Sequence, residues 1–304
     1  NQLIGATSEP WFSELKGRPL ADFLRTKREE IYQTFLTAMN SSACPFIKPI
    51  EIPKISIITS LYKGSKYIEH FLSEVSKQSV FDKCELIILD ANSPEKEYLT
   101  INAFCEKHDN VIYKRLDSTP SVQETMNMGI DLASGDFLAL WNIDDTRRYD
   151  ALEIMAKTLA VDDRVELVYG DCLQTTKENE TLEQNSANGL TYEHSREDFS
   201  KENMIKCLPG PLPIWKRDLN EKYGKFNEEL SFAGDWEMWL RAVGQGAKFK
   251  KIHEVLGLYY FNPTGLSTSP KKRKERFAEE KQIFHQYKDI FGENVYNRFS
   301  GYFS

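Results

Sequence analysis

Two adjacent carboxylates, Asp144 and Asp145, follow an apolar run at 137–141 that predicts a buried strand. Like charges at neighbouring positions repel each other, and the repulsion is costly where a buried strand ends. The cost falls when a cation lies between the two groups, and that cation is usually a metal ion or a charged group of a ligand. The doublet therefore predicts a metal or ligand site, with Asp144 and Asp145 as its carboxylates.

Polar residues also follow two other predicted strands. Thr59, Ser60 and Tyr62 come at the end of the strand at 55–59, and Asp90 directly follows the strand at 85–89. In open parallel sheets, ligands bind beyond the carboxyl ends of the strands, so these residues and the aspartates are expected on one edge. The alternative for each residue taken singly is an ordinary turn or cap.

The elements that must position these residues alternate along the chain between short apolar strands and amphipathic helices. The strands are predicted at 55–59, 85–89, 111–113, 137–141 and 166–169, and the helices at 66–78, 95–108, 121–133 and 149–160. This alternation predicts an α/β fold with a Rossmann-like, mostly parallel sheet and helices on both faces. Residues 1–53 are expected to form a helical N-terminal extension and linker, and 266–304 a C-terminal helical segment.

Composition narrows the class of protein. The chain has 304 residues, 40% of them hydrophobic, which is enough for a large core. A formal net charge of -7 argues against nucleic acid as a partner, because phosphate-backbone binding needs a basic face. The five cysteines form no CxxC pair, and no apolar run reaches the roughly 18 residues of a membrane span. We therefore expect a cytoplasmic enzyme, without a disulfide framework or a zinc site.

Several phosphate-binding and nucleophile motifs are absent from the sequence. Gly244-Gln-Gly246 lacks a third glycine and follows a predicted helix, so it is expected to end that helix and not to bind a dinucleotide. The patterns GxxxxGK[ST] and GxSxG do not occur, and the five histidines lack metal-ligand spacing. Of the ligand sites considered, the one that remains is a site for a diphosphate held by a carboxylate-bound divalent cation.

Four ordered motifs resemble those of glycosyltransferase family 2. They are Lys54-Ile-Ser-Ile-Ile-Thr-Ser-Leu-Tyr62, Glu85-Leu-Ile-Ile-Leu-Asp-Ala-Asn-Ser93, Asn127-Met-Gly-Ile-Asp-Leu-Ala-Ser-Gly-Asp136 and Gly234-Asp-Trp-Glu-Met-Trp-Leu-Arg241. The resemblance implies a GT-A catalytic domain over 54–265, with a nucleotide-sugar half at 54–146 and an acceptor half at 147–265. It also implies inverting transfer of a sugar from a nucleotide diphosphate, with a UDP-sugar as the expected donor and a carbohydrate-type acceptor.

The resemblance also assigns residues to the sugar-donor site. By position, Thr59, Ser60 and Tyr62 line the nucleoside pocket and Asp90 hydrogen-bonds the base. Asn142-Ile143-Asp144 occupies the place of the family's DxD motif, with Asp144 on a Mg²⁺ or Mn²⁺ ion that bridges the diphosphate, and Asp145 as a second carboxylate.

Asp235 occupies the position of the catalytic base in the family's motif, and it begins a predicted helix at 235–243. The helix dipole and free backbone N–H groups there favour an ionised carboxylate, which can accept a proton. The alternatives are that Asp235 is an N-cap, or that Glu237 is the base. Trp215 and Trp236 are candidate acceptor contacts, with burial in the core as the alternative for both.

The sequence departs from the family pattern near the expected phosphates. Asn142 replaces the first aspartate of DxD, Met126 replaces an arginine, and 259–263 lacks the usual Tyr-Arg-x-His. A basic cluster at 271–276 could neutralise phosphate, contact anionic lipid or simply be solvated. The basic cluster consists of Lys271, Lys272, Arg273, Lys274 and Arg276.

Two other functions stay open at this point. The departures would also fit a catalytically silent relative that binds nucleotide sugar or a partner protein. A nucleotidyltransferase can share such a sheet, but Ser60-Leu-Tyr-Lys-Gly64 does not resemble the glycine-rich basic loop expected after its first strand.

Overall fold

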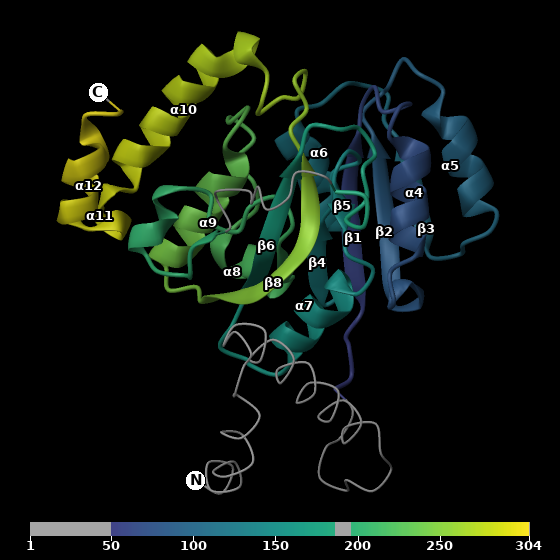
Figure 1. Cartoon of the computed structure of the whole chain (residues 1–304), viewed down its shortest axis with the longest axis horizontal. Helices are drawn as coiled ribbons and strands as arrows, with labels where there is room; N and C mark the ends of the chain where they lie inside the picture. Colours follow the sequence, from purple (N-terminus) through teal and green to yellow (C-terminus); the bar gives the residue numbers. More distant parts are fainter. Residues whose placement is uncertain (1–49, 186–195, 304) are drawn as a thin grey trace, which may run out of the picture. The chain divides into compact units, whose positions relative to one another are not determined.

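The structure, a computed structural model, describes residues 50–185 and 196–303 (Figure 1). Glu51–Ser304 form one compact unit. The expected N-terminal extension at 1–53 lies almost entirely outside the described residues.

An eight-stranded sheet forms the centre of this unit, in the order β3-β2-β1-β4-β7-β6-β8-β5. Its strands are β1 (Ile55–Leu61), β2 (Cys84–Asp90), β3 (Val111–Arg115), β4 (Phe137–Leu140), β5 (Thr146–Arg147), β6 (Leu167–Thr175), β7 (Ile214–Lys216) and β8 (Phe249–Tyr260). Parallel pairing joins β3, β2, β1 and β4, and also β6 to β8. The pairs β4–β7, β6–β7 and β5–β8 are antiparallel. The strands that follow β1 in the chain therefore lie on both sides of it, with β2 and β3 on one side and β4 on the other. In open α/β folds, ligands bind at such a point of the sheet.

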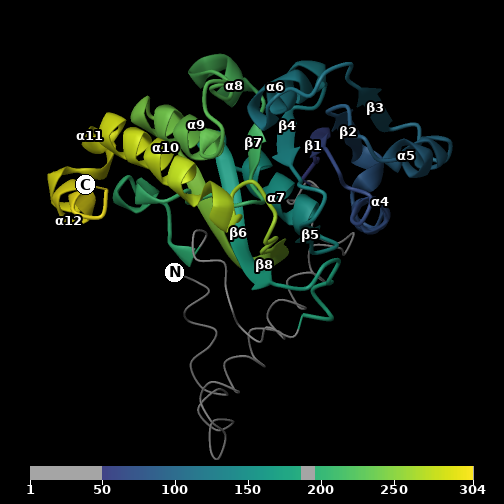
Figure 2. The same ribbon diagram turned by 90° about the horizontal axis from the view of Figure 1, so that it is seen from above.

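Helices cover both faces of the sheet. They are α4 (Ile68–Ser76), α5 (Glu97–Cys105), α6 (Val122–Leu132), α7 (Ala151–Ala160), α8 (Asp218–Tyr223), α9 (Gly234–Gly244), α10 (Arg273–Gln286), α11 (Lys288–Phe291) and α12 (Glu293–Ser300). Short 3-10 turns lie at Phe81–Lys83, Glu202–Ile205 and Pro270–Lys272. Buried side chains of α4, α5 and α7 pack on one face, while those of α6, α8, α9 and α10 pack on the other. Figure 2 shows α6, α8 and α9 on the side of the sheet opposite α4 and α7.

The predicted alternation of strands and helices is confirmed from β1 to the start of β6. Each predicted element is present, with ends that differ by a few residues. The sequence analysis missed β5, β7 and β8. These strands belong to the second half of the sheet, where β7 pairs antiparallel with β4 and β5 pairs antiparallel with β8. Trp215 lies in β7 and not in an irregular segment as expected. The interpretation of Gly244-Gln-Gly246 is confirmed, because α9 ends at Gly244 and Gly246 has a φ of 108°.

The C-terminal helices predicted at 266–304 are present, and they share the core of the sheet. Ile283 and Phe284 of α10 and Phe291 of α11 are fully buried against the cluster that contains Trp236 of α9. Trp236 and Phe291 stack with ring centroids 6.5 Å apart. Removing α10 would therefore expose the apolar face of α9.

No helix in residues 50–185 or 196–303 has the length and apolar character that crossing a bilayer requires.

Candidate active site

The carboxyl ends of β1, β2 and β4 meet at one edge of the sheet. Leu61 pairs with Asp90, and the Trp141 N–H donates to the Ile58 carbonyl. The buried Thr59 hydroxyl donates to the Trp141 carbonyl at 2.9 Å, so it ties these strand ends together. Of the predicted nucleoside cluster, Ser60 is partly exposed and Tyr62 is 46% exposed. These two residues can therefore touch a ligand directly.

Asp90 is fully buried and accepts hydrogen bonds from three neighbours. Its Oδ1 accepts from the Ser93 N–H at 2.7 Å. Its Oδ2 accepts from the Tyr113 hydroxyl at 2.7 Å and from the Arg115 guanidinium at 3.0 Å. Tyr113 and Arg115 come from β3 and were missed by the sequence analysis. A carboxylate offers about four acceptor positions, so roughly one remains for a ligand.

The loops after β1 and β2 are joined by a buried carboxylate. Glu97 Oε1 accepts from the Gly64 N–H at 2.6 Å and from the Ser93 hydroxyl at 2.8 Å. Lys63 and Asn92, one in each loop, have φ of 53° and 57°. Such left-handed backbone costs a residue with a side chain about 1 kcal/mol, and it is common at functional sites. Both loops are thus held in fixed, mildly strained shapes at the sheet edge.

The two adjacent aspartates, Asp144 and Asp145, lie in different surroundings. Asp145 is buried, and its Oδ1 accepts from the Tyr260 N–H at 3.0 Å while its Oδ2 accepts from the Asn142 amide at 3.0 Å. Burial, together with the charge of Asp144, raises the pKa of Asp145 well above its usual value. Asn142 is exposed and Ile143 packs close to Gly64. Asp145 is therefore bonded on both oxygens by the protein.

Asp144 is partly exposed and is held from the end of β8. The Asn262 amide donates to Asp144 Oδ2 at 3.1 Å, so the loop after β8 contacts the first aspartate of the doublet. Burial raises the pKa of Asp144. Tyr67 and Tyr260 lie close by, with their ring centroids 6.1 Å apart. Asn262 belongs to the segment 259–263, whose sequence differs from the family pattern. This segment therefore contacts Asp144, the predicted metal ligand.

A metal ion would find few protein ligands at this edge. Among residues 50–185 and 196–303, no group of three or more His, Cys, Asp or Glu side chains is arranged around a common point. Asp144 can offer a carboxylate oxygen and Asn142 a neutral amide oxygen. This set fits Mg²⁺ or Mn²⁺ when substrate phosphates supply the other oxygens, as these ions commonly bind.

Asp235 is the second residue of α9, and this helix begins beside α6. A Cβ on Gly234 would lie 2.8 Å from Cγ of Gln123, so the two helices start in contact. Because α6 follows the carboxyl end of β3, Asp235 lies at the same edge as Asp90. Its Oδ1 accepts from the Trp236 N–H at 2.8 Å, and its Oδ2 accepts from the Cys207 thiol at 3.3 Å. Burial raises the pKa of Asp235.

Glu237, the alternative base, is bonded within the protein. It is buried, and its Oε1 and Oε2 accept from the Arg241 guanidinium at 3.0 and 3.1 Å. The Tyr287 hydroxyl also donates to Oε1. These bonds make Glu237 part of the packing between α9 and the C-terminal helices.

Both candidate acceptor tryptophans are buried in the core. Trp215 is fully buried and donates its Nε1–H to Asn220 at 2.7 Å. Trp236 is 5% exposed and donates its Nε1–H to the Met204 carbonyl at 2.8 Å. Neither indole offers a free face to a sugar ring in this structure. Core burial, the alternative for both residues, is what the structure shows.

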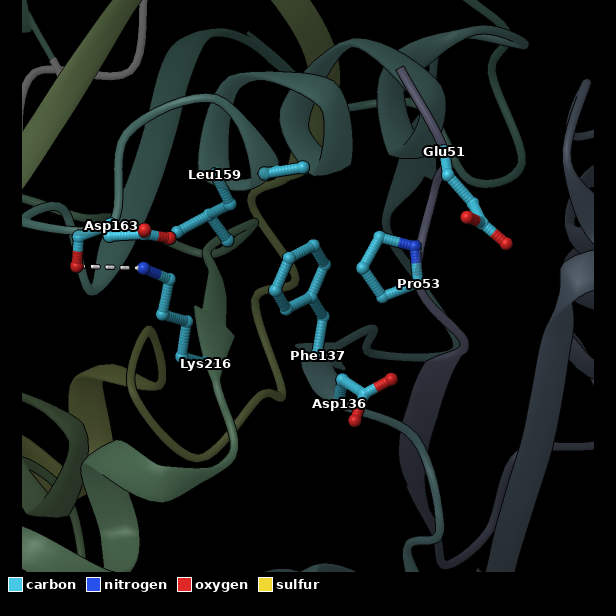
Figure 3. A pocket seen from close by; sticks show the side chains of 8 residues that line it. Glu51, Pro53, Asp136, Phe137, Leu159, Asp163 and Lys216 are labelled. Carbon is cyan, nitrogen blue, oxygen red and sulfur yellow. Dashed lines mark hydrogen bonds between the residues drawn. The ribbon is translucent and has the colours of Figure 1, made fainter. Parts of the chain in front are cut away.

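A surface hollow of about 490 Å³ lies at the opposite edge, near the amino ends of β1 and β4 (Figure 3). Glu51, Asp136 and Asp163 line it. Its lysine, Lys216, donates to the Asp163 carbonyl at 3.0 Å. Three carboxylates and an engaged lysine disfavour a diphosphate, so we assign the candidate site to the carboxyl edge.

Comparisons with known proteins bear on the family of the chain. A family model described as Glycosyl transferase family 2 matches residues 56–224, more than half of the chain. An uncharacterised glycosyltransferase of Methanocaldococcus jannaschii is 21% identical over 80% of this chain and 83% of its own length. The glycosyltransferase AglE of Haloferax volcanii is 25% identical over 70% of this chain and 69% of its own length.

Two solved structures share the fold. TarS of S. aureus in complex with UDP-GlcNAc superposes with a TM-score of 0.64 at 16% identity, over 81% of this chain and 73% of TarS. A mannosyltransferase of Pyrobaculum calidifontis in complex with GDP-Man and Mn²⁺ gives a TM-score of 0.60 at 18% identity, over 84% and 70% of the two chains. At these identities the likeness shows the GT-A fold alone.

Proposed function

The chain belongs to glycosyl transferase family 2, and from this premise we infer that it is an inverting enzyme that moves a sugar from a nucleoside diphosphate to a carbohydrate-type hydroxyl. The observation that carries the proposal is the placement of three carboxylates at one edge of the sheet. Asp90 ends β2, Asp144 follows β4, and Asp235 is the second residue of α9, which starts beside α6. They suit binding of the base, the diphosphate and the acceptor, respectively.

We propose a UDP-sugar as the donor. With three hydrogen bonds already accepted, Asp90 retains about one acceptor position, which matches the single imide N–H of uracil. Guanine would present an imide N–H and an amino group together. Ser60 and Tyr62 would line the nucleoside pocket beside it. The fold neighbour TarS binds UDP-GlcNAc, whereas the Pyrobaculum calidifontis neighbour binds GDP-Man, so both nucleotides belong in the test.

Asp144 would hold a divalent cation together with the phosphates of the sugar donor, and Asn142 could add its amide oxygen. When bound, Mg²⁺ or Mn²⁺ supplies positive charge that stabilises the departing diphosphate. We assign Asp145 to holding Asn142 and the end of β8, because both of its oxygens accept hydrogen bonds from the protein. This assignment revises the expectation that Asp145 is itself a ligand.

Asp235 would act as the general base. Its carboxylate takes the proton from the acceptor hydroxyl while the acceptor oxygen bonds to the anomeric carbon. The bond from that carbon to the diphosphate oxygen breaks, and its electron pair leaves with the diphosphate. Burial raises the pKa of Asp235, which makes its ionised form a stronger proton acceptor.

The test is turnover of UDP-GlcNAc, UDP-glucose and GDP-mannose with Mn²⁺, for wild type and for Asp235→Asn. The variant keeps the size of the side chain but cannot accept the proton, so transfer should fall by about 10² or more while nucleotide binding persists. Glu237→Gln is the comparison, with lower stability expected but turnover retained in the folded protein. Near-normal turnover by Asp235→Asn would disprove its assignment.

A catalytically silent relative remains the second candidate, because Asn142 replaces a charged ligand. It would bind a nucleotide sugar but neither transfer nor hydrolyse any donor of the panel.

We also propose that the basic cluster contacts anionic lipid. Lys271, Lys272, Arg273 and Lys274 are exposed. Each basic residue near an anionic surface contributes about 1 kcal/mol of binding. Sedimentation with phosphatidylserine vesicles should therefore exceed that with neutral phosphatidylcholine vesicles, and equal sedimentation with both would contradict the contact.

A further inference from the structure

A carboxylate of the C-terminal segment binds the loop that leads into the proposed base. Glu279 of α10 accepts from the Ser231 N–H at 2.7 Å, the Phe232 N–H at 2.7 Å and the Ala233 N–H at 2.6 Å. These three residues directly precede Gly234 and Asp235. Glu279 is partly buried, so these charge-assisted bonds are only partly screened by water.

Glu279 binds the backbone directly before a helix that has no side-chain cap of its own. The first N–H groups of a helix have no partner within the helix, and a side chain at the N-cap normally accepts one of them. In α9 the N-cap is Ala233, which has no side chain that could do so. Glu279, 46 residues later in the chain, supplies its negative charge at this helix start, where the helix dipole favours it.

Two further groups complete the surroundings of Asp235. The Cys207 thiol, from the segment before β7, donates to Oδ2. Glu280, next to Glu279 on α10, adds a second negative charge and lies 3.7 Å from the Arg276 guanidinium. The carboxylate of Asp235 is therefore oriented from one side by Cys207, while α10 fixes the backbone of residues 231–233 before it and contributes negative charge.

We propose that Glu279 is a positioning residue for Asp235, so that α10 takes part in the transfer reaction through its hold on residues 231–233. The inference rests on the proposed function, in which Asp235 is the base. It deepens that function, because it assigns the C-terminal segment outside the matched residues 56–224 to the active site. Glu279 holds the start of α9 in place, and its charge opposes ionisation of Asp235.

The proposal predicts a defined change in Glu279→Gln. The amide keeps the shape of the side chain but loses the charge and one acceptor oxygen. With the sugar donor that the wild type turns over fastest in the panel, kcat should fall about tenfold or more while the donor KM stays within about twofold. Loss of a neighbouring negative charge should also shift the acidic limb of the pH profile of kcat/KM to lower pH.

Two other variants separate positioning from folding. Glu279→Asp keeps the charge on a shorter side chain, so its acidic limb should stay near the wild-type pH although kcat falls. Glu275→Gln makes the same chemical change at an exposed position of α10 and should match the wild type in kcat, KM and pH profile. If Glu279→Gln does not fold, Glu279→Asp carries the test, and wild-type kcat in that variant would overturn the proposal.

Hydrogen exchange gives a readout that does not need turnover. Amide protons of residues 231–235 should exchange faster in Glu279→Gln than in Glu275→Gln. Wild-type kcat and an unshifted pH limb in folded Glu279→Gln, with Asp235→Asn inactive, would overturn this inference alone. Full activity of Asp235→Asn would instead refute the proposed base, whatever Glu279 does.

Discussion

Replacing Asp90 with asparagine tests the nucleoside site most directly. The Asp90 carboxylate accepts from the Ser93 N–H, the Tyr113 hydroxyl and the Arg115 guanidinium, which leaves about one acceptor position for the base of the nucleotide. Asparagine has nearly the same shape but offers one acceptor oxygen and one amide nitrogen. If the oxygen stays with the Ser93 N–H, the nitrogen faces Arg115, which can only donate. The variant therefore loses both the charge and the position offered to the base.

Two free energies change in Asp90→Asn. A hydrogen bond to a charged group contributes about 1.5 to 3 kcal/mol, so the affinity for UDP should fall roughly 10- to 100-fold. The free energy of unfolding should fall by only about 1 to 2 kcal/mol, because the side chain of Arg115 is 39% exposed and its ion pair is partly screened. Binding is thus expected to suffer at least as much as stability.

Calorimetric titration with UDP and urea unfolding measure the two effects. Tyr113→Phe is the matched control, since it removes one hydrogen bond to Asp90 but leaves the carboxylate in place. It should cost about 1 kcal/mol of stability while changing the UDP affinity by no more than about twofold. Equal losses of UDP affinity in both variants, or an unchanged affinity in Asp90→Asn, would refute the assignment of Asp90 to the base.

Two other predictions concern the metal and acid stability. Asp144→Ala should abolish the part of UDP-sugar affinity that depends on Mn²⁺, and equal binding by the wild type in EDTA would show the metal assignment to be wrong. Burial raises the pKa of Glu85, but hydrogen bonds from Lys54, Ser134 and Ser56 outweigh burial and lower the pKa from 4.5 to about 2. Because the folded pKa lies below the unfolded one, this stabilisation is complete above about pH 4.5 and is lost as the pH falls towards 2. After allowance for the exposure of Lys54, wild type should lose about 2 kcal/mol of unfolding free energy over that range beyond any loss in Glu85→Gln, and parallel pH curves would contradict this.

The first half of the fold could be predicted because its signals are local. Strands β1 and β2 are apolar runs, and helix α4 has buried residues at helical spacing, so each element is visible within about ten residues. Strand β7 has only three residues and follows Pro213, and the first half of β8 is charged and largely accessible. Both are strands because their neighbours pair with them, which no local pattern reveals.

The same distinction applies to the candidate site. Asp90 and Asp144 could be proposed from their positions after strands, but the partners of Asp90 depend on register. Arg115 faces Asp90 because these two residues pair at the ends of β3 and β2. Arg115 lies two residues beyond the strand predicted at 111–113, and that position was the one signal available in the sequence. The contacts of Glu279 and Cys207 join segments far apart in the chain, and they required the tertiary structure.

The adjacent aspartates show how the structure resolves a conflict that the sequence only poses. Repulsion at this strand end predicted a cation, and one buried cation belongs to the protein itself. Arg147 is buried and lies close enough to Asp145 to lower its pKa, against the larger effect of burial. Its guanidinium also donates to the carbonyls of Leu140 and Leu212, so it is fixed under the end of β4. Asp145 thus has a permanent partner inside the fold, and Asp144 is the carboxylate left for the metal ion and donor phosphates that we propose.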